Sequence, residues 1–307
     1  MDPINVLISL HRGYGLGDAV QMSAVLRHLR KFRPNWIIDY RAEPGRQTPG
    51  NGIVNTTFCY GEPFPRDYYH CEAELVLYDN FYNYNDRPNT RVTSCLHERF
   101  GLHWDAECAR YQVNVPELCN LDVAGFFVST IGYYSKKRAV AVHYQGDSDK
   151  VNKDLTHEQA NEICNHILNF GRVPLLLDWR DAMPVGKRAD VKTTGRLPKS
   201  LEWGRDAAYN CAVISQCEAF VGIDSGPGKC ASTTDTPALV TWTGHHPAPF
   251  HDPAQNTTHL VPVGYHGLKP VCNDAGVMNW FEANYNVRQY ERDPVGKIKE
   301  WLTEVLR

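Results

Sequence analysis

The sequence predicts an α/β protein with two domains, each built on a parallel sheet. Two observations support this prediction: a strand and helix alternation begins at Ile4, and a second alternation of the same kind begins at Ala139. Strands that alternate with crossover helices usually form parallel sheets. The chain has 307 residues, of which 42% are hydrophobic and 22% charged, so it can bury two medium-sized cores.

The first domain is predicted to open with a strand at Ile4–Leu10, followed by the glycine turn 13–17 and a helix. Apolar residues recur along this helix at a helical spacing, at Met22, Val25, Leu26, Leu29 and Phe32. Polar and basic side chains are expected on its opposite face, from Gln21, Arg27, His28, Arg30 and Lys31. Pro34 ends the helix, and Trp36–Tyr40 is the next strand.

Two segments of the first domain are predicted to be long loops over a sheet edge, at residues 41–65 and 79–91. They are rich in Gly, Pro and Asn or in polar and aromatic residues, and loops of this kind often carry function. An amphipathic segment at 116–138 ends in three basic residues. We therefore place the domains at 1–135 and 136–307, and we leave open whether the C-terminal helix packs back on the first domain.

The second domain repeats the alternation of the first. Strands are predicted at 139–144, 173–179, 218–223 and 237–244, and helices at 156–170, 204–216 and 226–233. Thr156 is the expected N-cap of its helix because Gln159 follows three residues later, as in a capping box.

Charge and cysteine content narrow the class of protein. The net charge of −3 argues against a chain-wide basic surface for nucleic acid or membranes, although residues 27–33 form one basic cluster that could meet an acidic ligand. The 10 cysteines lack C-x-x-C pairs, which predicts reduced and mostly buried thiols. Without a leader pattern or a bilayer-spanning apolar run, the sequence predicts a cytoplasmic protein with no transmembrane segment.

The glycine turn after the first strand is a candidate phosphate-binding site. Gly13 and Gly15 fit a dinucleotide-binding G-x-G-x-x-G pattern, and Asp39 lies where a ribose-binding acid would be expected. The third glycine position, however, holds Asp18, whose carboxylate would repel a pyrophosphate. Asp18 is then either a functional acid or a residue that stabilises the start of the helix.

A second candidate site is the segment FVGIDSGPGKCAS at 220–232. An apolar strand leads to Asp224 and Ser225, after which Gly226 and Pro227 suit the start of a helix. Lys229 in the first helical turn opposes the helix dipole, and a bound phosphate would turn this conflict into an attraction. A solvated lysine on an ordinary turn is the alternative.

A third candidate site follows the first strand of the second domain. His143 and Gln145 lie at the end of this strand, and Lys153 lies in the loop that precedes the next helix. Ligands of open α/β sheets bind at the carboxyl ends of strands, so these residues are candidate phosphate ligands, with a plain solvated loop as the alternative. His245, His246 and His251 are too loosely spaced, between prolines, to predict a metal site.

Together these segments resemble glycosyltransferase family 9, the heptosyltransferase-like enzymes of the GT-B fold. The family shows a G-[IL]-G-D turn at a helix start, a lysine after the first strand of the second domain, and a D-[ST]-G-P-x-H-x-A turn. The matching residues here are Gly15–Asp18, Lys153 and Asp224–Ala231. The order fits over most of the chain, and the departure is Lys229, which stands where the family usually has histidine.

The resemblance implies two Rossmann-like domains facing a cleft and a metal-independent, inverting transfer of a sugar from a nucleoside-diphosphate sugar to an acceptor hydroxyl. Asp18 would be the catalytic base, and no cofactor beyond the donor is expected. The implied donor ligands are Gly15, Gly17, His143, Gln145, Lys153, Asp224, Ser225, Gly226, Pro227 and Lys229.

The acceptor is not identified by the resemblance, and a glycan, a lipid-linked glycan or a modified nucleic acid would all fit. Tyr82, Tyr84 and Arg87, in the second long loop, are the candidate acceptor ligands because they can stack on a sugar or pair with it. Two other functions stay open at this stage. One is an NAD-dependent oxidoreductase that uses the N-terminal glycine turn, and the other is a non-catalytic protein that binds nucleotide sugars.

Overall fold

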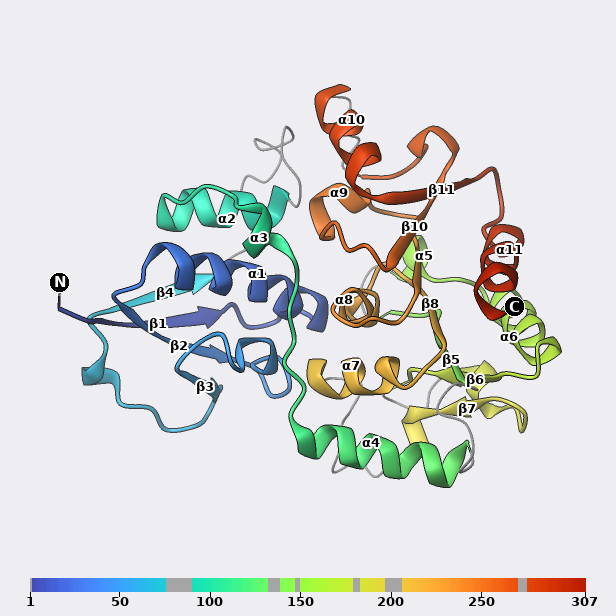
Figure 1. Cartoon of the computed structure of the whole chain (residues 1–307), viewed down its shortest axis with the longest axis horizontal. Coiled ribbons are helices and arrows are strands. Elements are labelled where there is room, and N and C mark those ends of the chain that lie inside the picture. The colour runs from blue at the N-terminus through green and yellow to red at the C-terminus, as the bar shows by residue number, and fades with distance from the viewer. Residues whose placement is uncertain are drawn as a thin grey trace.

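Two parallel sheets form the protein, and the carboxyl ends of the first sheet's strands point toward the second (Figure 1). The structure, a computed structural model, describes residues 2–75, 90–131, 139–146, 150–178, 183–196, 206–269 and 275–307. In its described part the first sheet has the order β3-β2-β1-β4. Its strands are β1 (Ile4–Leu10), β2 (Trp36–Ala42), β3 (Thr56–Cys59) and β4 (Cys71–Leu75).

The second sheet has the order β11-β10-β9-β8-β5-β6-β7 within the described residues. The reversal of strand order beside β5 and β8 is the kind of position where open α/β sheets bind ligands. Its strands are β5 (Ala139–His143), β6 (Val173–Leu176), β7 (Lys192–Thr193), β8 (Ala219–Ile223), β9 (Ala238–Thr241), β10 (Thr257–Pro262) and β11 (Asn286–Tyr290).

The helices cover these sheets and fill the space between them. In the first half of the chain they are α1 (Leu16–Phe32), α2 (Thr90–Phe100), α3 (Ala106–Ala109) and α4 (Glu117–Thr130). In the second half they are α5 (Lys150–Lys153), α6 (His157–Asn169), α7 (Ala207–Ser215), α8 (Gly226–Ser232), α9 (Pro247–Phe250), α10 (Ala275–Asn284) and α11 (Val295–Leu306). The α/β class and the predicted strands and helices of both halves are thereby confirmed, with small shifts at their ends.

Helix α1 departs in one respect from its predicted pattern. Met22, Val25 and Leu29 are fully buried as expected, but Gln21 and His28, which were expected on the polar face, are also 0% exposed. The reason is that α1 is covered on more than one side, by the first sheet and by α2, α3, α7 and α8. A helix surrounded in this way needs polar side chains that find buried partners, so amphipathic spacing alone misplaced these two.

Two cations of the basic cluster at 27–33 are engaged by the protein itself, while Arg30 and Lys31 stay exposed. Lys31 forms ion pairs of 2.9 and 2.8 Å with the carboxylates of Asp105 and Glu107. Arg27 donates to the backbone carbonyls of Glu107 and Arg110. The cluster therefore holds α3 and its flanking segment against α1.

Two glycines let α1 and α8 meet at their N-terminal ends. A Cβ atom on Gly226 would lie 2.8 Å from the Cβ of Leu16, and one on Gly17 would lie 3.2 Å from the Cδ and Nζ atoms of Lys229. A larger side chain at either position would displace these neighbouring atoms. This close approach places the start of α1, from the first half of the chain, directly beside the start of α8.

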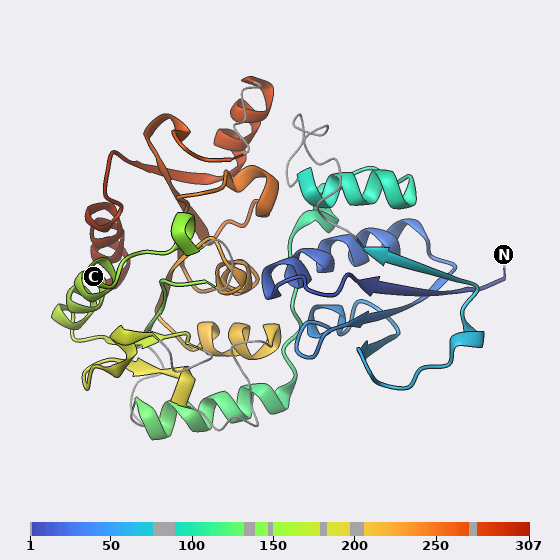
Figure 2. The same cartoon turned by 180° about the vertical axis from the view of Figure 1, so that it is seen from behind.

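Helix α4 lies with the second sheet rather than the first, as both views of the molecule show (Figure 2). It packs against α7, and the Tyr209 hydroxyl donates to the Asp122 carboxylate over 2.7 Å. Helix α11 packs on α6 through buried residues that include Ile298 and Trp301, so it covers the second sheet. The division of the chain into units at residue 135 stays a prediction.

The segment 41–65, predicted as a loop, contains a short 3-10 helix at Thr48–Gly50 and the edge strand β3. The described cysteines are free, and most are buried, with Cys71 exposed and Cys59 partly exposed. In the part of the chain that the structure describes, no helix has the length and apolar character needed to cross a membrane.

Candidate active site

A cluster of charged side chains lies where the starts of α1 and α8 meet. Asp18 comes from the first turn of α1, Asp224 from the segment that follows β8, and Lys153 from the end of α5. Lys229 of α8 lies between the two halves because its side chain packs against Gly17. The fold therefore brings together residues that were predicted as separate candidate sites.

Both carboxylate oxygens of Asp18 are hydrogen-bonded. Oδ2 accepts from the backbone N–H of Gly15 over 2.9 Å, and Oδ1 lies 2.9 Å from Nη2 of Arg91. The first contact is the one expected of a residue that stabilises a helix start. The second is not explained by capping, and it leaves the Asp18 side chain 13% exposed at the junction of the two halves.

Arg91 is a residue of this cluster that the sequence reasoning missed. Its side chain is 2% exposed, and besides Asp18 it donates to the Oε1 atom of Gln21 over 2.9 Å. Its guanidinium also lies over the ring of Phe250, 5.0 Å from the centroid. No motif surrounds Arg91 in the sequence, and a lone arginine at the start of a polar helix is normally exposed.

The carboxylate of Asp224 lies close to three basic side chains of the second half. This carboxylate, 3% exposed, lies 3.0 Å from Nζ of Lys153, 3.4 Å from Nζ of Lys229 and 3.5 Å from Nδ1 of His245. Burial by itself opposes ionisation, but the charges of Lys229 and Lys153 and the nearby imidazole of His245 outweigh it and hold the pKa of Asp224 well below its usual range. Asp224 is therefore a carboxylate at neutral pH.

Lys229 is held in a buried position between two acids. Burial lowers the pKa of its ammonium group, while the charges of Asp224 and Asp18 act in the opposite direction. A desolvated cation of this kind interacts strongly with any anion that enters, because little water screens it. The alternative prediction, that Lys229 is a solvated lysine on an ordinary turn, is wrong because the side chain is only 7% exposed.

Among the remaining predicted donor ligands, Ser225 and Pro227 lie at the start of α8, and His143 and Gln145 lie at the end of β5 or just after it. Ser225 is the N-cap of α8 and donates to the carbonyl of Ile223, while Pro227 occupies the first turn. His143 is buried, with Nδ1 3.0 Å from the carbonyl of Leu177, and Gln145 is partly buried just beyond β5. Tyr82, Tyr84 and Arg87, the candidate acceptor ligands, lie outside the described residues.

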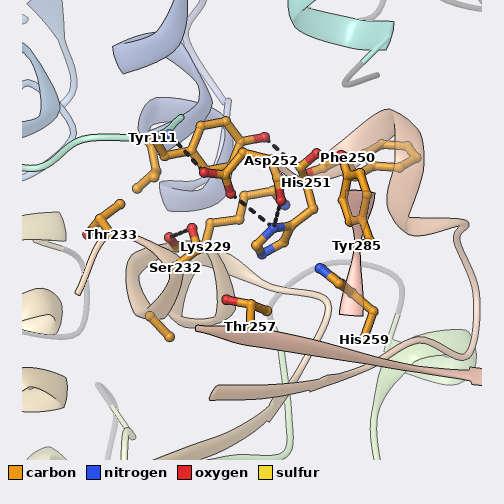
Figure 3. A network of polar contacts seen from close by, with 12 residues as sticks. Tyr111, Lys229, Ser232, Thr233, Phe250, His251, Asp252, Thr257, His259 and Tyr285 are labelled. Carbon is orange, nitrogen blue, oxygen red and sulfur yellow. Dashed lines mark hydrogen bonds and ion pairs between the residues drawn. The ribbon is translucent and has the colours of Figure 1, made fainter. Parts of the chain in front are cut away.

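The histidines of the loop after β9 have different environments. His245 faces Asp224, whereas His246 is 1% exposed and its Nδ1 accepts the N–H of Ala248 as the N-cap of α9. Nδ1 of His251 lies 3.1 Å from Oδ1 of Asp252, in the network of Figure 3. Across the described ranges no three His, Cys, Asp or Glu side chains are grouped as metal ligands would be.

We expect the buried imidazole of His246 to make stability depend on pH. Burial lowers its pKa to about 4, whereas the unfolded chain protonates histidine near pH ~6.5. Between these values the unfolded state binds the proton and the folded state does not, so stability falls as the pH decreases. At pH 5 the loss from this residue should be about 2 kcal/mol.

Urea unfolding of the wild type and of His246→Asn at pH 7 and pH 5 measures this effect. Asparagine can still cap α9 but cannot titrate, so the variant should lose about 2 kcal/mol less than the wild type on acidification. The control is His266→Asn, at an exposed position that leaves the buried imidazole in place. Equal losses in wild type and His246→Asn would show that His246 is not responsible.

The two parallel sheets, with a charged cluster between them at their carboxyl ends, define the GT-B fold. A solved glycosyltransferase of family 9 from Veillonella parvula DSM 2008 superposes with a TM-score of 0.67 at 14% identity, covering 100% of this chain and 98% of that one. The ADP-heptose LPS heptosyltransferase II of E. coli superposes at 0.63 and 14% identity, covering 99% and 98%.

A third solved structure, the E. coli heptosyltransferase WaaC with ADP, has a TM-score of 0.52 at 12% identity and covers 92% of this chain and 100% of its own. No family model and no curated protein matches the sequence. The fold implied by the resemblance to family 9 is thereby confirmed over the length of the chain.

Proposed function

We propose that the protein is a glycosyltransferase that moves a sugar from a nucleoside-diphosphate sugar to an acceptor hydroxyl with inversion. One observation carries this proposal: an acid from the first half, Asp18, lies close to the buried Lys229 of the second half, which shares the carboxylate of Asp224 with Lys153. An inverting transfer needs a base next to the acceptor oxygen and positive charge next to the leaving diphosphate.

The charge of the cluster suits a diphosphate. Arg91, Lys153 and Lys229 are three cations, and Asp18 and Asp224 are two carboxylates, so this group carries one excess positive charge. A nucleoside diphosphate would compensate that charge in a site with little solvent. The E. coli heptosyltransferase WaaC, which has a similar fold, was solved with ADP, and this supports a nucleoside diphosphate as the ligand.

In the proposed reaction the acceptor oxygen attacks the anomeric carbon of the donor and loses its proton to the Asp18 carboxylate. The bond from that carbon to the diphosphate oxygen breaks, and the electron pair leaves with the nucleoside diphosphate. Lys153 and Lys229 stabilise the negative charge that develops on the leaving group. No cofactor is part of this scheme, in which the two ammonium groups offset part of the diphosphate charge.

The environment of Asp39 favours transfer over the nicotinamide alternative. Asp39 is 5% exposed, and one of its carboxylate oxygens accepts the hydroxyl of Tyr69 over 2.8 Å. An acid engaged in this way is poorly placed to bind the hydroxyls of a ribose. A non-catalytic binding protein would keep the lysine cluster but would not need Asp18 near it.

The lysines should contribute directly to donor binding. Lys153→Ala and Lys229→Ala should each weaken the binding of the matching nucleoside diphosphate by about 1–3 kcal/mol, as expected for charge-assisted hydrogen bonds. Added salt should weaken binding to the wild type as well. Isothermal titration calorimetry measures both effects, with exposed Lys187→Ala as the matched control. Unchanged affinity in both cluster variants would remove the phosphate role from these lysines.

A screen of donor hydrolysis tests the function itself. The wild type is incubated with ADP-, GDP- and UDP-sugars, and release of the nucleoside diphosphate is measured. At least one donor should be hydrolysed slowly with water as acceptor, and the corresponding diphosphate should raise the melting temperature. Stabilisation by NAD(H) alone would instead favour the oxidoreductase, and diphosphate binding without hydrolysis or transfer would favour the binding protein.

A further inference from the structure

Arg91 connects Asp18, in the first half of the chain, to the second half of the protein. Its guanidinium donates to Asp18 and to Gln21, each over 2.9 Å, and it also lies over the ring of Phe250. Asp18 and Gln21 lie one turn apart on α1, whereas Phe250 ends α9 beside the second sheet. The side chain therefore touches both halves at once.

Gln21 and Tyr111 reinforce this connection. The Gln21 amide donates to the carbonyl of Phe250 and to the Tyr111 hydroxyl, both over 3.1 Å. The Tyr111 hydroxyl donates to the same carbonyl over 3.3 Å, and its backbone N–H donates to Asp252 over 2.9 Å (Figure 3). A continuous set of polar contacts thus runs from α1 to the segment that follows α9.

The geometry fixes the orientation of the Asp18 carboxylate. A guanidinium group is planar and its donors are rigidly spaced, so contacts with Gln21 and Phe250 leave Arg91 one direction in which to meet Asp18. Because Arg91 is almost fully buried, its charge also needs a carboxylate partner. Oδ1 is held by Arg91 and Oδ2 by the backbone of Gly15, which leaves the side chain little rotational freedom.

We propose that Arg91 is a positioning residue for Asp18, and that it couples the orientation of this base to the docking of α9 against the first half. This inference rests on the proposed function, in which Asp18 takes the acceptor proton. If α9 moves away, Arg91 loses its contact with Phe250 and Gln21 loses its acceptor on the same residue. The base is then oriented for reaction only when the two halves are in contact.

The decisive variant is Arg91→Lys, which keeps the buried charge but cannot reproduce the forked contact with Asp18 and Gln21. The assay is hydrolysis of the ADP-, GDP- or UDP-sugar that the wild type turns over. We expect kcat to fall about 10- to 100-fold, as for a displaced catalytic group. KM for the donor and the calorimetric affinity for its diphosphate should stay within about twofold, because Arg91 acts through the base.

The same change in an Asp18→Asn background separates positioning from a general structural role. If Arg91 acts through the carboxylate, Arg91→Lys should cost little further activity once Asp18 is neutral. Phe250→Leu, which keeps the arginine but removes the ring, should also lower kcat, by a smaller factor than Arg91→Lys. Arg188→Lys, at a partly exposed arginine paired with Asp190, is the matched control.

The outcomes distinguish this inference from the proposed function. A wild type that neither hydrolyses a donor nor binds a diphosphate overturns the proposed function, and the role of Arg91 falls with it. An active wild type with an equally active Arg91→Lys overturns the inference alone. Equal fractional losses from Arg91→Lys with and without Asp18 also overturn it, since they would mean that Arg91 does not act through the carboxylate.

Discussion

Asp18→Asn should lower the rate of sugar transfer by about two to four orders of magnitude, the usual cost of losing a general base. Asparagine has nearly the same shape and keeps an oxygen that can accept from Gly15 or from Arg91, but the buried charge of Arg91 loses its carboxylate partner, so stability should fall while the fold is kept. The affinity for the nucleoside diphosphate should change little, because the lysines that we assign to the phosphates are unaltered. Steady-state kinetics and calorimetry on the same preparations measure the two effects separately.

Glu98→Gln is the matched control for this prediction, because Glu98 is an exposed acid of α2 and makes the same change of charge. It should turn over like the wild type. If Asp18→Asn does so too, Asp18 serves only to stabilise the start of α1 through its contact with Gly15. The proposed mechanism would then need another base.

Asp224→Ala should reduce the free energy of unfolding by about 3–5 kcal/mol, the usual cost of removing one partner from a buried ion pair. The variant leaves Lys153 and Lys229 close together without the carboxylate that lies between them. Their mutual repulsion adds to the desolvation of Lys229. Urea unfolding at pH 7 measures the loss.

Asp190→Ala is the corresponding control, because Asp190 pairs with Arg188 and is 49% exposed. Its loss should be within about 1 kcal/mol, as for surface ion pairs. Added nucleoside diphosphate should recover part of the stability of Asp224→Ala, since phosphate charge would replace the missing carboxylate. A loss no larger than that of Asp190→Ala would mean that Asp224 does not stabilise the lysines.

The sequence by itself determined strands β1, β2, β5, β6, β8 and β9 and the segments that carry Asp18, Asp224 and both lysines, but not the other strands of the two sheets. Buried parallel strands such as β5 and β8 are short apolar runs, and the turns after them are marked by glycine, proline and polar residues that few other structures require. For this reason Asp18, Asp224 and Lys229 stood out before the fold was known. Each of them belongs to a short recognisable segment that follows a strand, and ligands of this fold bind at such strand ends.

Only the tertiary structure decided which of these residues meet, and which others join them. Gln21 and His28 were assigned to a polar surface because helical spacing reports one buried face, whereas α1 is enclosed by several elements. Arg91 has no neighbouring motif, and it becomes a partner of Asp18 only because α2 packs beside α1. Burial of a charge depends on contacts between segments far apart in the chain, and no local pattern of residues encodes those contacts.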